Sequence, residues 1–464
     1  PVLRGSAENG DIFFQHREAC NPYYDAFPAI VEEYMDKVNA KIGTDYKLFN
    51  YHGAADAESV IVAMGSVCDT IDETIDYLLA RGEKVGVVKV RLYRPFSAKH
   101  LIDAIPDTVK YISVLDRTKE PGALGEPLYL DVVAALKGTK FNDIPVFCGR
   151  YGLGSKDTTP AQIISVFKNT TKEKFTIGIV DDVTNLSLEI TENPVTAPEG
   201  TTACKFWGLG ADGTVGANKN SIKIIGDHTD KYAQAYFDYD SKKSGGVTIS
   251  HLRFGDKKIQ STYLINQANF VACHTPAYVR KYNMVQDLVD GGTFLLNCSW
   301  NMDELEEHLP GQVKRYIAEH NIKFYTIDGI SIGKEVGLGG RINTILQAAF
   351  FKLANVIPFE DAVEYGADGK MLPLAKFSFD VSVYACGALG KRVELTANDY
   401  TVDMGGLNLT NPVVGKYTIT YTYKADASIT YTVTVWVYDA DYTFSADQDS
   451  SNNGWLFFEG ALTN

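Results

Sequence analysis

The stretch that decides the fold spans residues 206–219 and reads FWGLGADGTVGANK. Three of its glycines, Gly208, Gly210 and Gly213, have the spacing G-x-G-x-x-G that is typical of a dinucleotide-binding turn. A short apolar run precedes them and a helix-like run over residues 221–225 follows them, so they stand where a strand passes into a helix. Because glycine allows close approach of the backbone and a helix start favours an anion, the stretch predicts a phosphate-binding turn.

The composition is that of a large globular protein. With 464 residues, 45% of them hydrophobic and 22% charged, the chain is long enough for roughly two to four domains. Its formal net charge of −14 argues against a nucleic acid or an anionic membrane surface as the main partner. No apolar run reaches the roughly 18 residues of a membrane span, so none is expected. Because Pro1 is not a usual first residue, we expect a fragment of a longer protein.

Seven cysteines and eight histidines are scattered along the chain, without a C-x-x-C or H-E-x-x-H motif. This spacing is typical of reduced, mostly buried thiols in a cytoplasmic protein. It argues against zinc ribbons and cysteine-ligated iron–sulfur clusters, and we expect no metal site.

Residues 59–150 alternate strand and helix patterns after a connecting loop and helix over residues 1–58. Short apolar runs predict strands at Ser59–Met64, Val85–Val90, Tyr111–Asp116 and Ile144–Cys148. Short connections with this alternation predict a parallel sheet with helices on both faces. The run Thr70-Ile71-Asp72-Glu73 matches a capping box and predicts the start of one of these helices.

Basic residues follow the predicted strands of this domain. Lys89, Arg91 and Arg94 lie near the carboxyl end of the second strand, where ligands bind in α/β sheets. We expect them to form ion pairs between domains rather than a ligand site.

Residues 151–369 are expected to form a second α/β domain. Its first strand is predicted at Phe175–Val180, and a helix is predicted at Asp303–Glu319 nearer its end. After the glycine stretch, a strand at Tyr232–Asp240 leads into Lys242 and Lys243 within the turn SKKSGG. A nicotinamide cofactor would need a ribose-binding carboxylate here, which Asp238 or Asp240 could supply. Two adjacent lysines are a better receptor for an additional phosphate.

A second glycine-rich stretch, residues 337–343, introduces a long apolar helix and makes another phosphate-friendly helix start. From residue 370 to residue 464 the pattern changes to period two, with Phe377–Val383, Tyr417–Tyr423 and Ile429–Val437 as strands. These predict a small all-β sandwich, either truncated or left with an unpaired edge.

Six segments, in order, carry a resemblance to the middle of pyruvate:ferredoxin (flavodoxin) oxidoreductase. They are Arg4–Asn9, Val87–Phe96, Leu115–Gly122, Cys204–Lys219, Asp240–Phe254 and Gly337–Asn343. The resemblance extends over residues 1 to about 366. It implies an α/β protein in which a transketolase-C-terminal-like domain precedes a gamma-type, Rossmann-like domain. The tail resembles a bacterial immunoglobulin-like module.

The resembled family oxidatively decarboxylates pyruvate to acetyl-CoA, using thiamine diphosphate and iron–sulfur clusters, and passes electrons to ferredoxin or flavodoxin. The resemblance implies that the gamma-type domain contributes to coenzyme A (CoA) binding. By motif, the implied CoA contacts are Ala211, Asp212, Gly213, Thr214, Val215, Lys243 and Asn343. The chemistry agrees, because the CoA pyrophosphate suits a helix N-terminus and its 3′-phosphate suits a lysine.

The family's thiamine-binding and cluster-binding domains have no counterpart in this sequence. We therefore expect neither thiamine diphosphate nor iron–sulfur clusters in this chain, no catalytic residue, and no pyruvate oxidation by the chain alone; a homodimer stays open. Two other hypotheses remain. The β-rich tail could be the working part of a surface or interaction module, or the glycine loop could serve an NAD(P)-dependent dehydrogenase.

Overall fold

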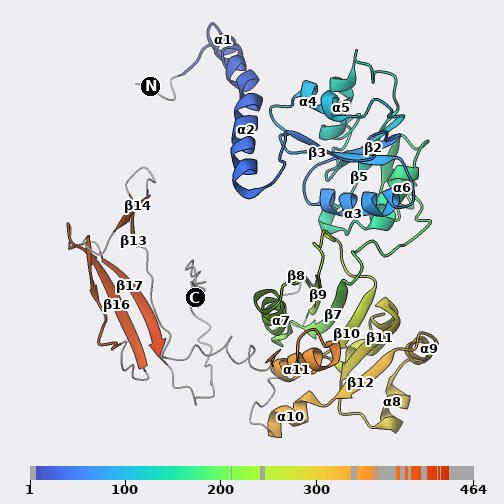
Figure 1. Cartoon of the computed structure of the whole chain (residues 1–464), viewed down its shortest axis with the longest axis vertical. Helices are drawn as coiled ribbons and strands as arrows, with labels where there is room; N and C mark the ends of the chain where they lie inside the picture. The colour runs from blue at the N-terminus through green and yellow to red at the C-terminus, as the bar shows by residue number, and fades with distance from the viewer. Residues whose placement is uncertain are drawn as a thin grey trace. The chain divides into compact units, whose positions relative to one another are not determined.

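The computed structural model in Figure 1 describes most of the chain. The described residues are 7–210, 212–240, 246–335, 342–358, 361–362, 383–386, 392–395, 399–408, 415–425, 427–428 and 430–437. They belong to two compact units, residues 1–357 and residues 358–464. The first unit contains two six-stranded sheets, and the strands described in the second unit are all antiparallel. Two α/β sheets followed by a β-rich segment confirm the predicted fold class.

The first sheet has the strand order β1-β3-β2-β4-β5-β6. Its strands are β1 (Phe49–Gly53), β2 (Ser59–Ala63), β3 (Val85–Val90), β4 (Tyr111–Asp116), β5 (Val146–Arg150) and β6 (Lys174–Thr176). All neighbours are parallel except β1, which pairs antiparallel with β3 at one edge. The β-branched residues of these short runs fill a sheet that is covered on both faces.

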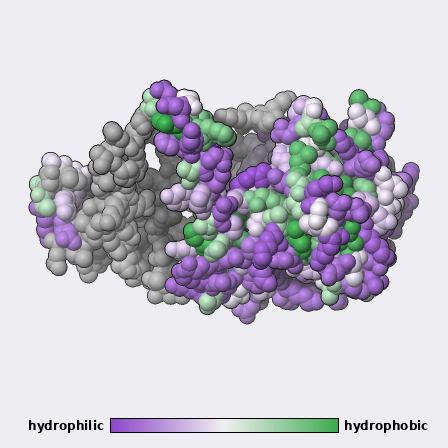
Figure 2. Space-filling view, turned by 90° about the horizontal axis from the view of Figure 1, so that it is seen from above, coloured by the Kyte–Doolittle hydropathy of each residue, from purple (hydrophilic) through white to green (hydrophobic). Residues whose placement is uncertain are grey.

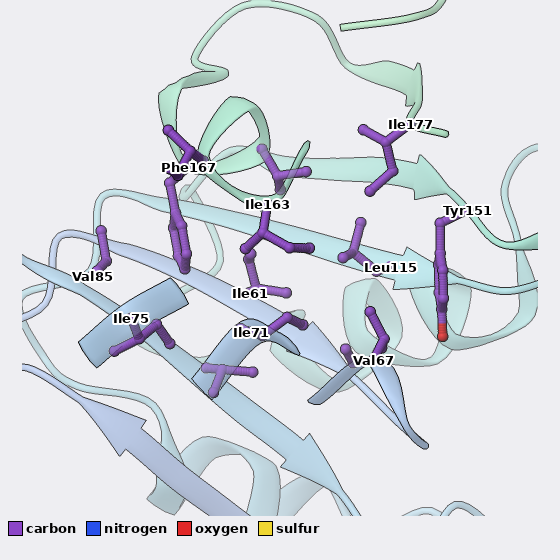
Figure 3. Packing of buried hydrophobic residues seen from close by; sticks show 14 of the residues in the cluster. Ile61, Val67, Ile71, Ile75, Val85, Leu115, Tyr151, Ile163, Phe167 and Ile177 are labelled. Carbon is purple, nitrogen blue, oxygen red and sulfur yellow. The ribbon is translucent and has the colours of Figure 1, made fainter. Parts of the chain in front are cut away.

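Helices cover the two faces of this sheet in pairs. They are α3 (Val67–Leu79), α4 (Ala98–Ala104), α5 (Pro127–Leu136) and α6 (Pro160–Lys168), with the 3₁₀ turn η1 (Leu153–Ser155) before α6. Side chains of α3 and α6 pack on one face with Ile61 and Leu115 (Figure 3). Side chains of α4 and α5 pack on the other face with Val60 and Val114.

Two helices precede the first sheet, α1 (Phe13–Glu18) and α2 (Asn21–Ile42). No residue of α2 is fully buried, and apolar side chains including Phe27, Ile30 and Tyr34 are exposed along it. In the view of Figure 2, hydrophobic and hydrophilic residues are interspersed over the described surface.

Two expectations for this region were wrong. Phe175, expected to begin the second α/β domain, lies in β6 and pairs with β5 of the first sheet. The run at residues 70–73 does not begin a helix, because α3 already starts at Val67. Glu73 is buried and accepts hydrogen bonds from residues far along the chain instead of capping its own helix.

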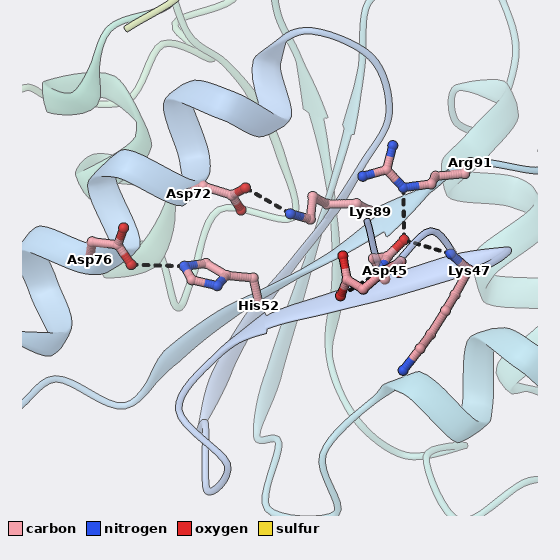
Figure 4. A network of polar contacts seen from close by, with 8 residues as sticks. Asp45, Lys47, His52, Asp72, Asp76, Lys89 and Arg91 are labelled. Atoms are coloured by element: carbon pink, nitrogen blue, oxygen red, sulfur yellow. Dashed lines mark hydrogen bonds and ion pairs between the residues drawn. The ribbon is translucent and has the colours of Figure 1, made fainter. Parts of the chain in front are cut away.

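The basic residues near the end of β3 are paired with residues on the first sheet and on the helices that cover it. Lys89 Nζ donates to Asp72 Oδ2 of α3 at 2.7 Å, and Arg91 Nε donates to Asn50 Oδ1 at 2.7 Å (Figure 4). Arg94 pairs with Asp131 of α5 at 2.7 Å. Ion pairs do form, but the expectation that they bridge two domains was wrong.

The second sheet has the strand order β12-β11-β10-β7-β9-β8. Its strands are β7 (Thr202–Leu209), β8 (Tyr232–Tyr239), β9 (Val247–Gly255), β10 (Ala268–Cys273), β11 (Leu288–Asn297) and β12 (Lys323–Ile327). The four strands from β12 to β7 are parallel, whereas β9 runs antiparallel to both of its neighbours. The carboxyl ends of β7, β10 and β11 therefore meet at one edge.

Helices of the second sheet are α7 (Thr214–His228), α8 (Met302–His308), α9 (Gly311–Glu319), α10 (Gly329–Glu335) and α11 (Asn343–Ala354), with 3₁₀ turns η2 (Pro276–Arg280) and η3 (Val285–Asp287). On one face Phe350 of α11 packs against Phe206 and Phe270 at ring-centroid distances of 5.1 and 5.3 Å. Side chains of α8 and α9 pack into the opposite core. The helix expected over residues 303–319 is two helices, because Pro310 lies between them.

The described part of the second unit contains β13 (Val383–Cys386), β14 (Arg392–Leu395), β15 (Tyr400–Asp403), β16 (Gly415–Tyr423) and β17 (Thr430–Val437). The strands expected at residues 417–423 and 429–437 correspond to β16 and β17, which pair antiparallel. The strand expected at residues 377–383 falls almost wholly outside the described residues. The immunoglobulin-like sandwich stays a prediction.

The cysteines agree with the expectation of unpaired, buried thiols. Six of them lie in described surroundings, none of these six is in a disulfide, and all but Cys20 are buried. Burial raises the pKa of the Cys273 thiol to about 12. Within the described part of the chain, no helix is both long and apolar enough to cross a membrane.

Candidate functional site

The glycine loop, residues 208–213, joins β7 to α7 at the carboxyl edge of the second sheet. The strand ends at Leu209, and the helix begins at Thr214 rather than at the apolar run that starts with Ser221. Gly213 occupies the N-cap position with φ +84°, a conformation that favours glycine. This is the strand–turn–helix arrangement that the sequence predicted for an anion-binding turn.

Asp212 holds the loop through its own carboxylate. Its Oδ2 accepts a hydrogen bond from the amide of Leu209 at 2.8 Å, and its Oδ1 accepts one from the amide of Thr214 at 2.8 Å. A helix leaves its first amide groups without carbonyl partners, and Asp212 satisfies the first of them. The amides of Val215 and Gly216 belong to the same first turn, and among the described residues no backbone carbonyl outside the helix accepts from them, so they can face an anion.

The first glycine of the motif has a packing reason. A Cβ at Gly208 would lie 2.6 Å from Thr214 Oγ1 and 3.0 Å from Asp212 Oδ2. A side chain at Gly208 would therefore displace both residues that shape the loop. Glycine at this position lets the end of the strand and the start of the helix come together.

Gly246, the residue before β9, lies beside the loop. Gly210 N donates to the carbonyl of Gly246 at 2.7 Å, which fixes the start of β9 against the glycine loop. This contact follows from the antiparallel direction of β9, whose first residue pairs with the last of β7. Ala211 and Lys243, two of the predicted CoA contacts, lie outside the described residues.

The other predicted contacts come together. Asn343, the first residue of α11, packs against Gly213, where a Cβ would lie 3.0 Å from Asn343 Nδ2. One turn further along α11, Gln347 Nε2 donates to Ser221 Oγ of α7 at 3.0 Å. The starts of α7 and α11, 130 residues apart in the sequence at Gly213 and Asn343, thus lie together, with Asp212 and Val215 partly exposed and Thr214 buried beneath them.

Sequence reasoning missed His274, which lies directly beneath the loop. The residue follows β10, is 6% exposed, and its Nδ1 lies 2.8 Å from Thr214 Oγ1. Burial lowers the pKa of His274 to about 4, while the nearby Asp212 carboxylate acts in the opposite direction. The imidazole is therefore neutral near pH 7. The sequence signal that could have identified His274 is its position directly after an apolar strand, where ligands bind in α/β sheets.

Asn297 was also missed, although it ends β11 at the same edge. It is 3% exposed, donates from Nδ2 to the His274 carbonyl at 2.9 Å, and accepts at Oδ1 from Gly329 N at 3.0 Å. These contacts hold His274, which lies against the loop, and Gly329 at the start of α10. The arrangement can bind an anionic ligand, and the described residues contain no group of His, Cys, Asp and Glu placed to hold a metal ion.

Two protein-family models match the chain. Residues 57–163 match pyruvate:ferredoxin oxidoreductase core domain II. Residues 203–368, which contain the glycine loop and Asn343, match pyruvate ferredoxin/flavodoxin oxidoreductase.

Curated relatives of the chain include a pyruvate:ferredoxin oxidoreductase and a pyruvate-flavodoxin oxidoreductase. The chain is 59% identical over 372 residues to the pyruvate:ferredoxin oxidoreductase of Moorella thermoacetica, covering 79% of this chain and 32% of that protein. It is 59% identical over 370 residues to the pyruvate-flavodoxin oxidoreductase of Enterobacter agglomerans, with the same two shares. The chain therefore spans about a third of the length of these relatives.

Among solved structures, the chain resembles the pyruvate oxidoreductase subunit PORC of Thermotoga maritima. The match has 17% sequence identity and a TM-score of 0.31, and it covers 38% of this chain and 88% of that subunit.

Proposed function

Residues 57–163 and 203–368 belong to the pyruvate:ferredoxin (flavodoxin) oxidoreductase family, and from this membership we propose that the chain is a CoA-binding central segment of such an enzyme. The family reaction converts pyruvate and CoA to acetyl-CoA and CO₂ and delivers electrons to ferredoxin or flavodoxin. In this proposal the chain contributes the CoA site, and the chemistry at the 2-oxoacid belongs to other parts of the enzyme.

One observation carries the proposal: Asn343 lies against Gly213. This contact brings together the loop before α7 and the start of α11, both of which the family resemblance implies as CoA contacts. Gly246, three residues after Lys243 in the sequence, is hydrogen-bonded to the same loop. All of the proposed contacts on described residues thus lie at one sheet edge.

The two phosphate groups of CoA have different partners in this proposal. The pyrophosphate lies at the first turn of α7, where the amides of Val215 and Gly216 and the helix dipole favour negative charge. Asp212 does not compete for these amides, because its oxygens accept from Leu209 and Thr214. The ribose 3′-phosphate pairs with Lys243 through a charge-assisted hydrogen bond, which is stronger than a hydrogen bond between neutral groups.

The experiment is isothermal titration of the full chain with CoA and, separately, with dephospho-CoA, which lacks the 3′-phosphate. We expect Lys243→Ala to weaken CoA binding roughly tenfold and to leave dephospho-CoA binding unchanged. Asn343→Ala is expected to weaken both ligands. The matched control is Lys323→Ala, which removes an exposed lysine at the start of β12, on the opposite edge of the sheet.

Three outcomes would contradict the proposal. The first is no heat with millimolar CoA. The second is equal weakening of CoA and dephospho-CoA by Lys243→Ala, which would remove Lys243 from the 3′-phosphate. The third is binding of NADPH in preference to CoA, which would favour the dehydrogenase hypothesis.

A further inference from the structure

The contacts around the glycine loop close into a ring. From Thr214 they pass to His274, then to Asn297, then to Gly329 at the start of α10. They return through the N-cap of α11 to Asn343 and Gly213. The ring joins the carboxyl ends of three parallel strands to the starts of three helices.

Asn297 is the member of the ring that bonds in both directions through one side chain. Its amide nitrogen donates to the carbonyl of His274, and its amide oxygen accepts from the amide of Gly329. The two partners demand opposite ends of the side-chain amide, so only one orientation satisfies both. At 3% exposure, water does not replace either bond readily.

The first arm of the ring leads from Asn297 to the loop. His274 is held from three sides, since its own amide donates to the Trp207 carbonyl at 2.9 Å, its carbonyl accepts from Asn297, and Nδ1 meets the Thr214 hydroxyl. Thr214 is the first residue of α7 and is 1% exposed. The placement of Asn297 therefore bears on the placement of the first turn of α7.

The second arm leads from Asn297 to Asn343. Gly329 fits closely, because a Cβ there would lie 3.0 Å from Asn297 Oδ1 and 3.4 Å from Ile342 Cβ. Ile342 is the N-cap of α11, and the next residue is Asn343. Asn297 is thus in contact, through Gly329, with the element that carries Asn343 over Gly213.

We propose that Asn297 is a positioning residue for the ligand site: through His274 and Gly329 it sets the first turn of α7 and the start of α11 at the separation that CoA requires. Asn297 itself touches no ligand. The inference rests on the proposed function, because the ligand it serves is the CoA proposed for the same loop.

The test compares Asn297→Ala, Asn297→Asp and Asn269→Ala in the full chain. Asn269 is the matched control, because its Oδ1 accepts from the amide of Ala203 at 2.9 Å at the amino ends of β7 and β10. Three quantities are measured for each variant. They are the Kd for CoA, the free energy of unfolding in urea, and the imidazole ¹⁵N chemical shifts of His274, assigned with His274→Gln.

We expect Asn297→Ala to weaken CoA binding roughly tenfold and to shift the Nδ1 resonance of His274. Asn297→Asp keeps an oxygen that accepts from Gly329, but it places a second oxygen, which cannot donate, against the His274 carbonyl. It should therefore also shift the His274 resonance and bind CoA as weakly as Asn297→Ala. Asn269→Ala should lower stability without either effect.

The outcomes separate this inference from the proposed function. If the unmodified chain does not bind CoA, the proposed function fails, and the His274 resonance alone decides whether Asn297 positions the loop. If the unmodified chain binds CoA but Asn297→Ala binds equally tightly, the positioning role is wrong and the proposed function stands. A His274 resonance unmoved by Asn297→Ala would also overturn the inference.

Discussion

Glu73 Oε1 accepts a hydrogen bond from the hydroxyl of Tyr263 at 2.6 Å, although 190 residues separate them in the sequence. Glu73 lies on α3 beside the first sheet, and Tyr263 lies in the segment between β9 and β10 of the second sheet. The same carboxylate accepts from Thr196 Oγ1 at 2.6 Å and from Ser261 Oγ at 2.5 Å. A buried carboxylate with three hydroxyl donors thus links the two α/β sheets.

Tyr263→Phe is predicted to lower the free energy of unfolding by about 2 kcal/mol, because it removes a hydrogen bond to a buried charged acceptor. Burial and the Glu73 carboxylate raise the pKa of Tyr263 to about 12, so the hydroxyl is protonated at neutral pH. Urea unfolding measures the change. Tyr232→Phe, at a tyrosine that is 51% exposed, should be nearly neutral. Equal stability of the two variants would show that the other two donors satisfy Glu73.

Two glycines of the loop region should respond to alanine in opposite directions. Gly213→Ala is predicted to destabilise the chain by about 1–2 kcal/mol, because φ is +84° and the new Cβ meets Asn343. Gly216→Ala is predicted to stabilise it by about 0.5–1 kcal/mol, since an added Cβ there meets nothing within 4 Å inside a helix. Paired urea titrations measure both. A destabilising Gly216→Ala would mean that α7 begins later than Thr214.

Acidification should weaken the fold through two buried histidines. Burial lowers the pKa of His274 to about 4 and that of His251 to about 3, from a model-peptide value of 6.5. The unfolded chain then binds more protons than the folded chain below pH 6.5. Neither histidine lowers the free energy of unfolding above that pH. As the pH drops towards the pKa of the folded state, each histidine lowers the free energy of unfolding, by about 2 kcal/mol at pH 5.

The measurement is the free energy of unfolding at pH 7 and pH 5 for the parent chain and for His251→Gln. The variant should lose less stability on acidification than the parent. An identical loss in both proteins would mean that His251 is not buried in its neutral form.

Two fully buried serines offer a matched pair. Ser250 Oγ finds no hydrogen-bond partner among the described residues, whereas Ser221 Oγ accepts from Gln347 Nε2 at 3.0 Å and donates to the Ala217 carbonyl. Ser250→Ala is therefore predicted to be neutral or slightly stabilising, and Ser221→Ala to cost about 1 kcal/mol. Thermal unfolding of both variants tests the difference. A clear loss at Ser250 would indicate an ordered water on its hydroxyl.

Local pattern was enough to find many of the elements. The strands predicted at Val85–Val90 and Tyr111–Asp116 have the same bounds in the structure, because β-branched runs ended by polar residues are decided locally. The turn at Gly213 was likewise predictable, since its positive φ favours glycine.

Pairing and long-range contacts were not predictable in the same way. Nothing in the run of β9 says that it lies antiparallel between β7 and β8, since strand direction depends on which neighbours it meets. The capping-box prediction at Glu73 failed because its partners are distant in the sequence. His274 follows one apolar strand and Asn297 ends another, but their links to Thr214 and Gly329 exist only in the folded sheet.

The two hydrogen bonds that Asp212 accepts have a kinetic consequence. Leu209 and Thr214 are already held by the Asp212 carboxylate and need no rearrangement when a ligand arrives, so we expect association to be governed by diffusion and charge. The chain carries a formal net charge of −14, and CoA is an anion, so the two repel over a distance that salt shortens. For the proposed ligand, the association rate constant should therefore rise as salt is added, the reverse of electrostatic steering.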